Sequence, residues 1–93
     1  MVVGILTVKL YIGGANSLKE KRRVLKSLID RIKARFNVSI AEVGELDAWQ
    51  HSVVGISFVS NEQAHASRVL AAVVNFIEQQ GAVQLVDFQT DLL

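Results

Sequence analysis

Residues 2–20, VVGILTVKLYIGGANSLKE, contain a strand signal followed directly by a helix signal. From Val2 to Ile12 the even-numbered residues are almost all apolar, whereas the odd-numbered residues become more polar along the chain. This period of two predicts a β-strand with one buried face. Gly13 and Gly14 end the strand.

A capping box marks the start of the first helix. Ser17 and Glu20 have the spacing at which each side chain can satisfy a free backbone amide near the helix start. We predict a helix over about residues 17–36, ended by Asn37 in a left-handed conformation. One stripe at helical spacing is apolar and should face the core: Leu18, Leu25, Leu28, Ile29, Ile32 and Phe36.

Two further strands are expected around a polar turn. Residues 38–43 predict a short strand, and residues 50–60 a longer one with Val54, Ile56 and Phe58 on one face. Because the two segments are so close in sequence, we expect an antiparallel hairpin.

A second helix and a last strand complete the chain. Ser60 with Gln63 offers another capping box, with Asn61 as the alternative cap, and Gly81 is expected to supply the C-terminal cap. The last strand is predicted over 83–88, with an extension toward residue 92 left open. The core face of this helix is predicted to comprise Ala66, Val69, Leu70, Val73 and Ile77.

The order strand–helix–strand–strand–helix–strand predicts a ferredoxin-like α+β sandwich, with a four-stranded antiparallel sheet and two helices on one face. A chain of 93 residues is expected to form a single domain over 1–93. It is 51% hydrophobic and 20% charged, which excludes a disordered tail.

The absence of cysteine excludes disulfides and thiolate metal sites. The apolar run at the N-terminus has no basic leader and is far shorter than the about 20 residues that a spanning helix needs. We therefore expect a cytoplasmic protein without a membrane partner.

The formal net charge of +1 conceals a strong segregation of charge. Eight of the ten basic residues lie between Lys19 and Arg35, where only Glu20 and Asp30 oppose them. The predicted first helix therefore carries a net charge of +6 and the remainder of the chain −5.

Four of these eight basic residues fall on one flank of the apolar stripe, at about 100° per residue. That flank holds Lys19, Arg22, Lys26 and Lys33, with Arg23 just beyond it and Arg31 and Arg35 on the opposite flank. Charges at one-turn spacing can follow a phosphate backbone, which predicts RNA contact. The alternative is that long charged side chains simply solvate a surface helix. Lys21 falls on the core side of the first turn, where its stem can snorkel to solvent.

The second face of the predicted sheet is left open. Its residues are expected to be Val3, Ile5, Thr7, Lys9 and Tyr11 with Val53, Gly55, Ser57 and Val59. Tyr11 is the only aromatic residue among them, so a sheet that stacks RNA bases in the manner of an RRM domain is excluded. Small, moderately apolar residues instead suggest a covering protein surface, of which a homodimer is the simplest.

Gly13-Gly14 before a capped helix resembles an anion site, to which Lys19 and Arg22 could contribute. Its spacing matches neither a Walker loop nor a dinucleotide fingerprint, and a strand end followed by a helix cap explains it more simply. An acylphosphatase-like or other phosphate-handling enzyme that uses this loop and Arg22 remains a minority alternative.

The remaining polar residues do not form a recognisable catalytic set. His51 and His65 have no ligand spacing, so we expect no metal site and no cofactor. Acidic residues cluster in the predicted hairpin turn beside Trp49, where a solvated tip explains them better than acid–base chemistry does: they are Glu42, Glu45 and Asp47. We assign no catalytic residue.

The segment SLKEKRRVLKSL at 17–28 resembles a bacterial family of proteins of unknown function, DUF503, also called the YlxP-like proteins. The similarity continues through RFNVS at 35–39, AEVG at 41–44, Asp47, Trp49 and VSN at 59–61. The resemblance implies a ferredoxin-like α+β fold and coding beside genes for translation initiation and ribosome maturation. It brings no established catalytic residues, and its recurring motif falls on Ser17, Leu18, Lys19, Lys21 and Arg22.

These observations favour a non-enzymatic protein that associates with RNA or a ribosomal subunit through the first helix. The residues expected to contact phosphate are Lys19, Arg22, Arg23, Lys26 and Lys33. The alternative is a homodimeric protein-interaction or regulatory module that pairs through the open sheet and makes no direct contact with nucleic acid.

Overall fold

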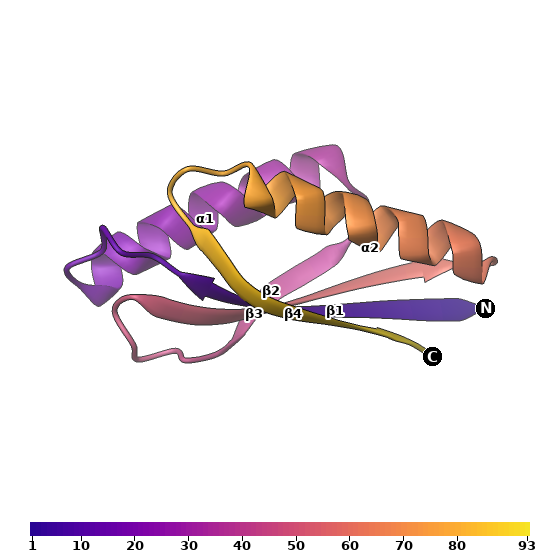
Figure 1. Cartoon of the computed structure of the whole chain (residues 1–93), viewed down its shortest axis with the longest axis horizontal. Helices are drawn as coiled ribbons and strands as arrows, with labels where there is room; N and C mark the ends of the chain where they lie inside the picture. The colour runs from indigo at the N-terminus through magenta and orange to yellow at the C-terminus, as the bar shows by residue number, and fades with distance from the viewer.

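The computed structural model describes all residues, 1–93, and has two helices lying across one face of a four-stranded sheet (Figure 1). All strands are antiparallel, in the order β2-β3-β1-β4. The predicted ferredoxin-like α+β fold is therefore confirmed. The elements are β1 (Val2–Tyr11), α1 (Leu18–Arg35), β2 (Ser39–Gly44), β3 (His51–Ser60), α2 (Gln63–Glu78) and β4 (Gln84–Leu92).

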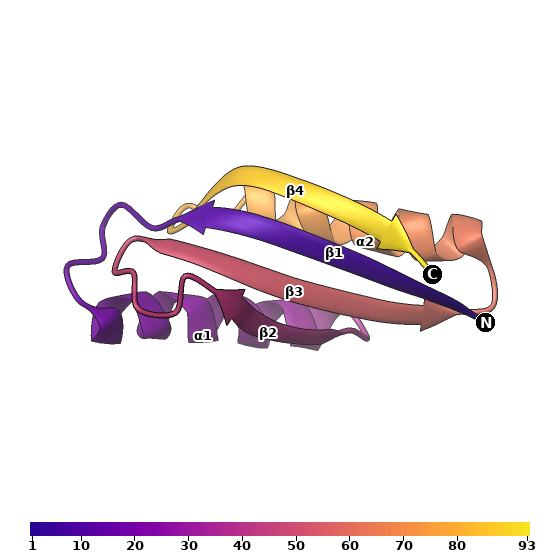
Figure 2. The same cartoon turned by 90° about the horizontal axis from the view of Figure 1, so that it is seen from below.

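β1 lies in the middle of the sheet, and its alternation of residue types sets the layers. It pairs with β3 over its whole length, from Val2 opposite Ser60 to Tyr11 opposite His51, and with β4 on its other side. Its even-numbered residues from Gly4 onward are buried under the helices, as the period of two predicted. Seen from below, the strands stand in front of both helices, so the second sheet face is open (Figure 2).

The core forms between this inner face and one stripe of each helix. The predicted stripe of α1 is buried at Leu25, Leu28 and Ile32, whereas Leu18 and Ile29 are only partly buried. The α2 face is buried largely as predicted, with Val74 added and Val69 only partly covered. The packed residues that share this core are Leu6, Val8, Leu10, Ile12, Val54, Ile56, Leu70, Val73 and Ile77.

The predicted C-terminal caps of both helices are wrong. Asn37 is not left-handed, because α1 ends on Phe36 in an extended conformation with φ of −128°. Gly81 does not cap α2, which ends at Glu78 with Gln79 as its cap, and no glycine has a positive φ. Both connections reach the following strand without a residue of positive φ, the first through residues 36–38 and the second through residues 79–83.

The start of α2 also differs from the predicted capping box. Its N-cap residue is Glu62, which makes no side-chain cap, so neither Ser60 nor Asn61 occupies that position. The Ser60 hydroxyl instead accepts a hydrogen bond from the Glu62 amide at 3.1 Å, which closes the turn out of β3.

The close approach of α2 to β1 depends on Gly4. A Cβ atom at this position would lie 2.8 Å from Leu70 Cδ1 and 3.6 Å from Ala66 Cβ, both in the buried interface. We expect Gly4→Val to lower the free energy of unfolding by about 1–3 kcal/mol through overpacking. Gly14→Val is the matched control, because nothing lies within 4 Å of its position, and urea unfolding should show the smaller change there. Equal losses would contradict this account of the interface.

Candidate nucleic-acid interface

The basic flank of α1 is exposed along its length. Ser17 caps the helix and its hydroxyl accepts from the Glu20 amide at 3.1 Å, which confirms this half of the predicted capping box. From this start, the side chains of Lys19, Arg22, Lys26 and Lys33 recur at near one-turn spacing, and all four residues are exposed. Arg23 is exposed as well, further toward the outer side of the helix.

The opposite flank of α1 faces α2 and is already engaged. The Arg35 guanidinium lies 5.3 Å from the centre of the Phe76 ring, a cation–π contact. Arg31 donates a hydrogen bond to Gln80 Oε1 at 2.9 Å. The cations free for a partner are therefore concentrated on the flank that points away from α2.

One member of the free flank is paired within the helix. Lys26 Nζ lies 2.8 Å from Asp30 Oδ2, and both side chains are largely exposed. The hydrogen bond to Asp30, and then the attraction of its charge, raise the pKa of Lys26 above its ordinary value. A phosphate would therefore have to compete with Asp30 for Lys26.

The start of α1 offers little to an anion, although its glycines suggested one. The Glu20 carboxylate accepts a hydrogen bond from the Asn16 amide, so a negative side chain already occupies the helix N-terminus. In the preceding loop, the carbonyls of Gly13 and Ala15 accept from Gln50 Nε2 at 3.1 and 3.2 Å. These bonds order the loop, and the Glu20 carboxylate beside the helix start would repel a phosphate there.

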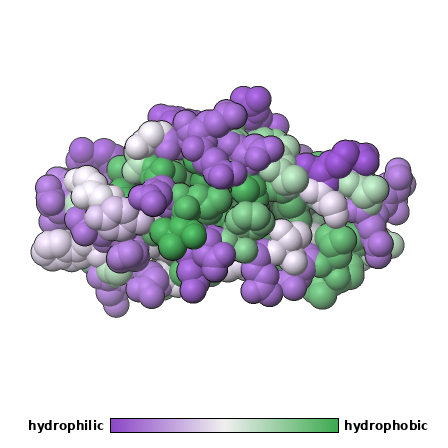
Figure 3. All heavy atoms as spheres, in the orientation of Figure 1, coloured by the Kyte–Doolittle hydropathy of each residue, from purple (hydrophilic) through white to green (hydrophobic).

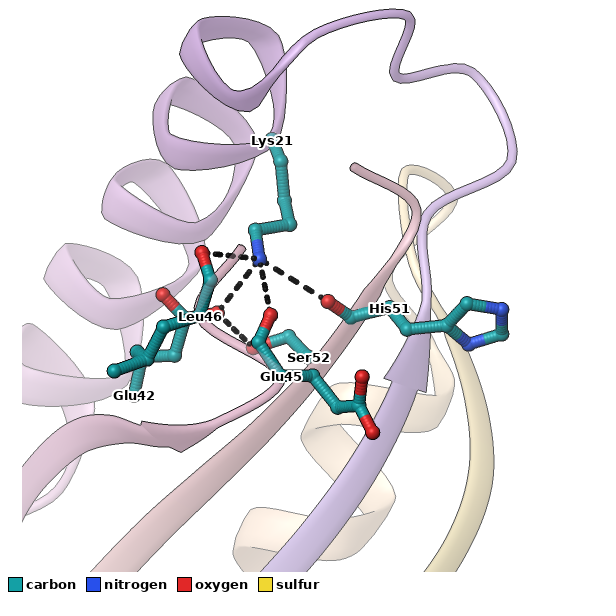
Figure 4. A network of polar contacts seen from close by, with 6 residues as sticks. All are labelled: Lys21, Glu42, Glu45, Leu46, His51 and Ser52. Carbon is teal, nitrogen blue, oxygen red and sulfur yellow. Dashed lines mark hydrogen bonds and ion pairs between the residues drawn. The ribbon is translucent and has the colours of Figure 1, made fainter. Parts of the chain in front are cut away.

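Lys21 is completely buried and makes the densest polar contacts in the molecule (Figure 4). Its Nζ donates to the carbonyl oxygens of Glu45 at 2.8 Å, His51 at 3.1 Å and Leu46 at 3.4 Å. It also lies 3.0 Å from Glu42 Oε2, so an ammonium removed from water has a full set of acceptors.

The Glu42 carboxylate is shared between two donors. The Ser52 hydroxyl donates to Glu42 Oε2 at 2.7 Å, and Ser52 is itself buried. Lys21 therefore does not snorkel, and Glu42 does not belong to a solvated hairpin tip, so both expectations are wrong. The wheel position of Lys21 on the core side was the available signal, whereas its acceptors come from residues 42–51 and could not be read from helical spacing.

This buried cluster ties α1 to the loop between β2 and β3. Glu45 is the one non-glycine residue with a positive φ, 57°, and its carbonyl is the nearest acceptor of Lys21. The ammonium thus holds a turn in a conformation that glutamate adopts at some cost. Because the same lysine lies in the first turn of α1, the cluster also sets where Lys19 and Arg22 are presented.

The two histidines lie in different parts of the molecule, each beside an aromatic ring, and three further candidates lie on the hairpin loop. Trp49, Glu45 and Asp47 are exposed on the hairpin loop, as expected for its tip. The His51 ring packs beside Tyr11 at 5.3 Å between ring centres, and the His65 ring beside Phe58 at 5.4 Å. No group of three or more acidic, histidine or cysteine side chains could hold a metal ion.

The open sheet face carries the residues that the alternation predicted. The register of β1 and β3 places Val3 opposite Val59, Ile5 opposite Ser57, and Tyr11 opposite His51. Val43 and Val59 are each 59% exposed on this side of the sheet.

No helix of the structure combines the length and apolar character needed to cross a bilayer.

Comparison with known proteins places the chain in a family. The family model described as "Protein of unknown function (DUF503)" matches residues 3–90, so the chain belongs to this family. The chain is similar to the uncharacterized protein YlxP of Bacillus subtilis (strain 168), with 40% identity over 77 residues, covering 83% of this chain and 84% of that protein. The resemblance expected from residues 17–28 is thereby confirmed.

The buried cluster makes Lys21 and Lys19 a matched pair for mutation. We expect Lys21→Met to lower the free energy of unfolding by about 3 kcal/mol, because it removes the ammonium that pairs with the part-buried Glu42 carboxylate and donates to three backbone carbonyls. Lys19→Met removes an exposed lysine two residues away and should change the free energy of unfolding by no more than about 0.5 kcal/mol. Chemical denaturation of both variants checks this, and equal values would show that the cluster contributes nothing.

Proposed function

We propose that the protein is a non-enzymatic RNA- or ribosome-associated protein that binds the phosphate backbone through the outer flank of α1. The contacting residues are Lys19, Arg22, Arg23, Lys26 and Lys33. The single observation that carries the proposal is the exposure of these five cations on one helix whose other flank and core stripe are already engaged.

The charge balance supports this surface over the rest of the molecule. Of the basic residues on α1, Lys21 is matched by Glu42 and Lys26 by Asp30, whereas Lys19, Arg22, Arg23 and Lys33 are in neither ion pair. Exposed arginine and lysine at near one-turn spacing neutralise successive phosphates without reading bases, and release condensed counterions. The expected binding is therefore weakly dependent on sequence and strongly dependent on salt.

The proposal predicts a salt-dependent affinity for structured RNA that the basic flank supplies. Five phosphate contacts correspond to a slope of log K against log salt of about −3.5 to −4.5. Replacing Lys19, Arg22 and Lys26 together by glutamate should reduce the magnitude of that slope by at least about 2 and abolish cosedimentation with ribosomal subunits at moderate salt. Fluorescence titration across a salt series measures the slope.

Two exposed basic residues outside α1 provide the control. Lys9 lies in β1 and Arg68 in α2, and both are exposed. The double variant Lys9→Glu, Arg68→Glu should keep more than half of the slope of log K against log salt, because neither residue lies on the basic flank of α1. Absence of RNA binding at low salt, or equal losses in the two sets of variants, would overturn the proposal.

A second candidate function is a homodimeric interaction module that uses the open sheet face and does not contact nucleic acid. The exposed Val43 and Val59 on this face favour it, because exposed apolar surface is stabilised by a covering partner. It predicts that Val59→Lys shifts a dimer toward monomer in light scattering. A strict monomer of the unmodified chain at high concentration would exclude this function.

A further inference from the structure

β4 leaves one side without a partner strand. It stands at the end of the sheet order and pairs only with β1, while β2, at the other end, has only six residues. β4 runs over nine residues, Gln84–Leu92, and its register shift against β1 falls early, opposite the Lys9/Leu10 step. The remainder, from Asp87 onward, is a regular edge of the kind to which another strand can add.

The register shows which backbone groups point outward. Val3 and Leu93 exchange both backbone hydrogen bonds, at 2.9 and 2.8 Å, and such pairs alternate with non-bonded pairs along an antiparallel ladder. Every second pair back from Val3 and Leu93 is therefore bonded. The non-bonded pairs between them contain Phe88, Thr90 and Leu92. Their amides and carbonyls therefore point away from β1, at the spacing that an added strand would meet.

One of these outward amides already bonds to a side chain. The Phe88 amide donates to Oδ1 of the neighbouring Asp87 at 2.9 Å. This contact agrees with the register, since the amide is not used by β1. An incoming backbone carbonyl can replace the exposed carboxylate as its acceptor.

The side chains of two of these residues, Phe88 and Thr90, border a groove on the helix side of the sheet. Phe88 is 51% exposed there, and with Thr90 it faces α2 across an open groove of about 370 Å³. The α2 residues along it are mostly small or polar, namely Ser67, Ala71, Val74, Asn75 and Glu78. Figure 3 shows apolar side chains gathered between α2 and β4 in a hydrophilic surround.

The charges beside this edge discriminate between partners. Asp87 and Asp91 lie on the opposite face of β4, and Glu78 lies at the groove. Antiparallel pairing of two copies of β4 would bring four aspartates onto one face, which is unfavourable. A strand with lysine or arginine on that face would instead meet opposite charges.

We propose that the outer edge of β4, together with the groove beside α2, binds an extended peptide by strand addition. The peptide places apolar side chains in the groove at alternate positions, and lysine or arginine side chains between them lie near Asp87 and Asp91. This site is separate from the basic flank of α1 and does not depend on the function proposed for it.

The test is a titration of the isotope-labelled full chain with the synthetic peptide Lys-Val-Lys-Leu-Lys-Val-Lys, followed by NMR. The amides of Phe88, Thr90 and Leu92 should shift and become protected from hydrogen exchange. A peptide of the same composition with its lysines in one block should bind at least about tenfold more weakly, because it cannot place apolar groups and charges on alternate faces.

Two neighbouring alanines of α2 provide matched variants. Ala71 and Ala72 are both exposed, but only Ala71 lines the groove. Ala71→Arg should weaken binding by about tenfold or more by filling the groove and repelling the peptide, whereas Ala72→Arg should change it by less than about threefold. Similar losses in both variants would overturn the groove assignment.

Charge reversal gives a gain of binding that misfolding cannot imitate. Asp87→Lys with Asp91→Lys should abolish binding of the basic peptide and create binding of Glu-Val-Glu-Leu-Glu-Val-Glu, while Asp47→Lys on the hairpin loop should do neither. If the basic peptide causes no shifts in β4, or if shifts fall elsewhere, the aspartates only guard the edge against self-association, and the proposal is wrong.

Discussion

The contact between the Lys21 ammonium and the loop that joins β2 to β3 determines how the N-terminal half of the molecule is arranged. A fully buried cation is tolerable only with acceptors around it, and here Glu42 and three carbonyls supply them. The contact joins the first turn of α1 to a loop that is otherwise exposed and contains a strained residue, Glu45. One side chain thus connects the basic flank of α1 to the hairpin loop.

The segregation of charge along the sequence becomes a segregation across the sheet. α1 lies over the β2 side, and its free cations point away from α2, whereas Asp87 and Asp91 lie on β4 at the other edge (Figure 2). The net charge of +1 is therefore the sum of a basic surface on one side of the molecule and acidic residues on the other. Two surfaces of opposite sign suit two kinds of partner, and they can be mutated independently because they share no residue.

The elements themselves were predictable because their signals are local. The alternation in Val2–Ile12 depends only on strand geometry, and the cap at Ser17 only on neighbours three residues away. The predictions of helix ends failed where a residue can adopt either a left-handed or an ordinary backbone conformation. Asn37 and Gly81 are residues that tolerate left-handed turns, but neither adopts one, because the route of the chain into the next strand decided otherwise.

The sequence by itself determined the order of elements, the buried faces and the concentration of basic residues on one helix, since each follows from helical or strand periodicity. Only the tertiary structure decided that Lys21 is withdrawn from the basic set, and that the amides of Phe88, Thr90 and Leu92 face outward. The physical reason is the same in both cases. A buried charge and a strand edge are defined by partners from distant segments, so neither leaves a repeat in the local sequence.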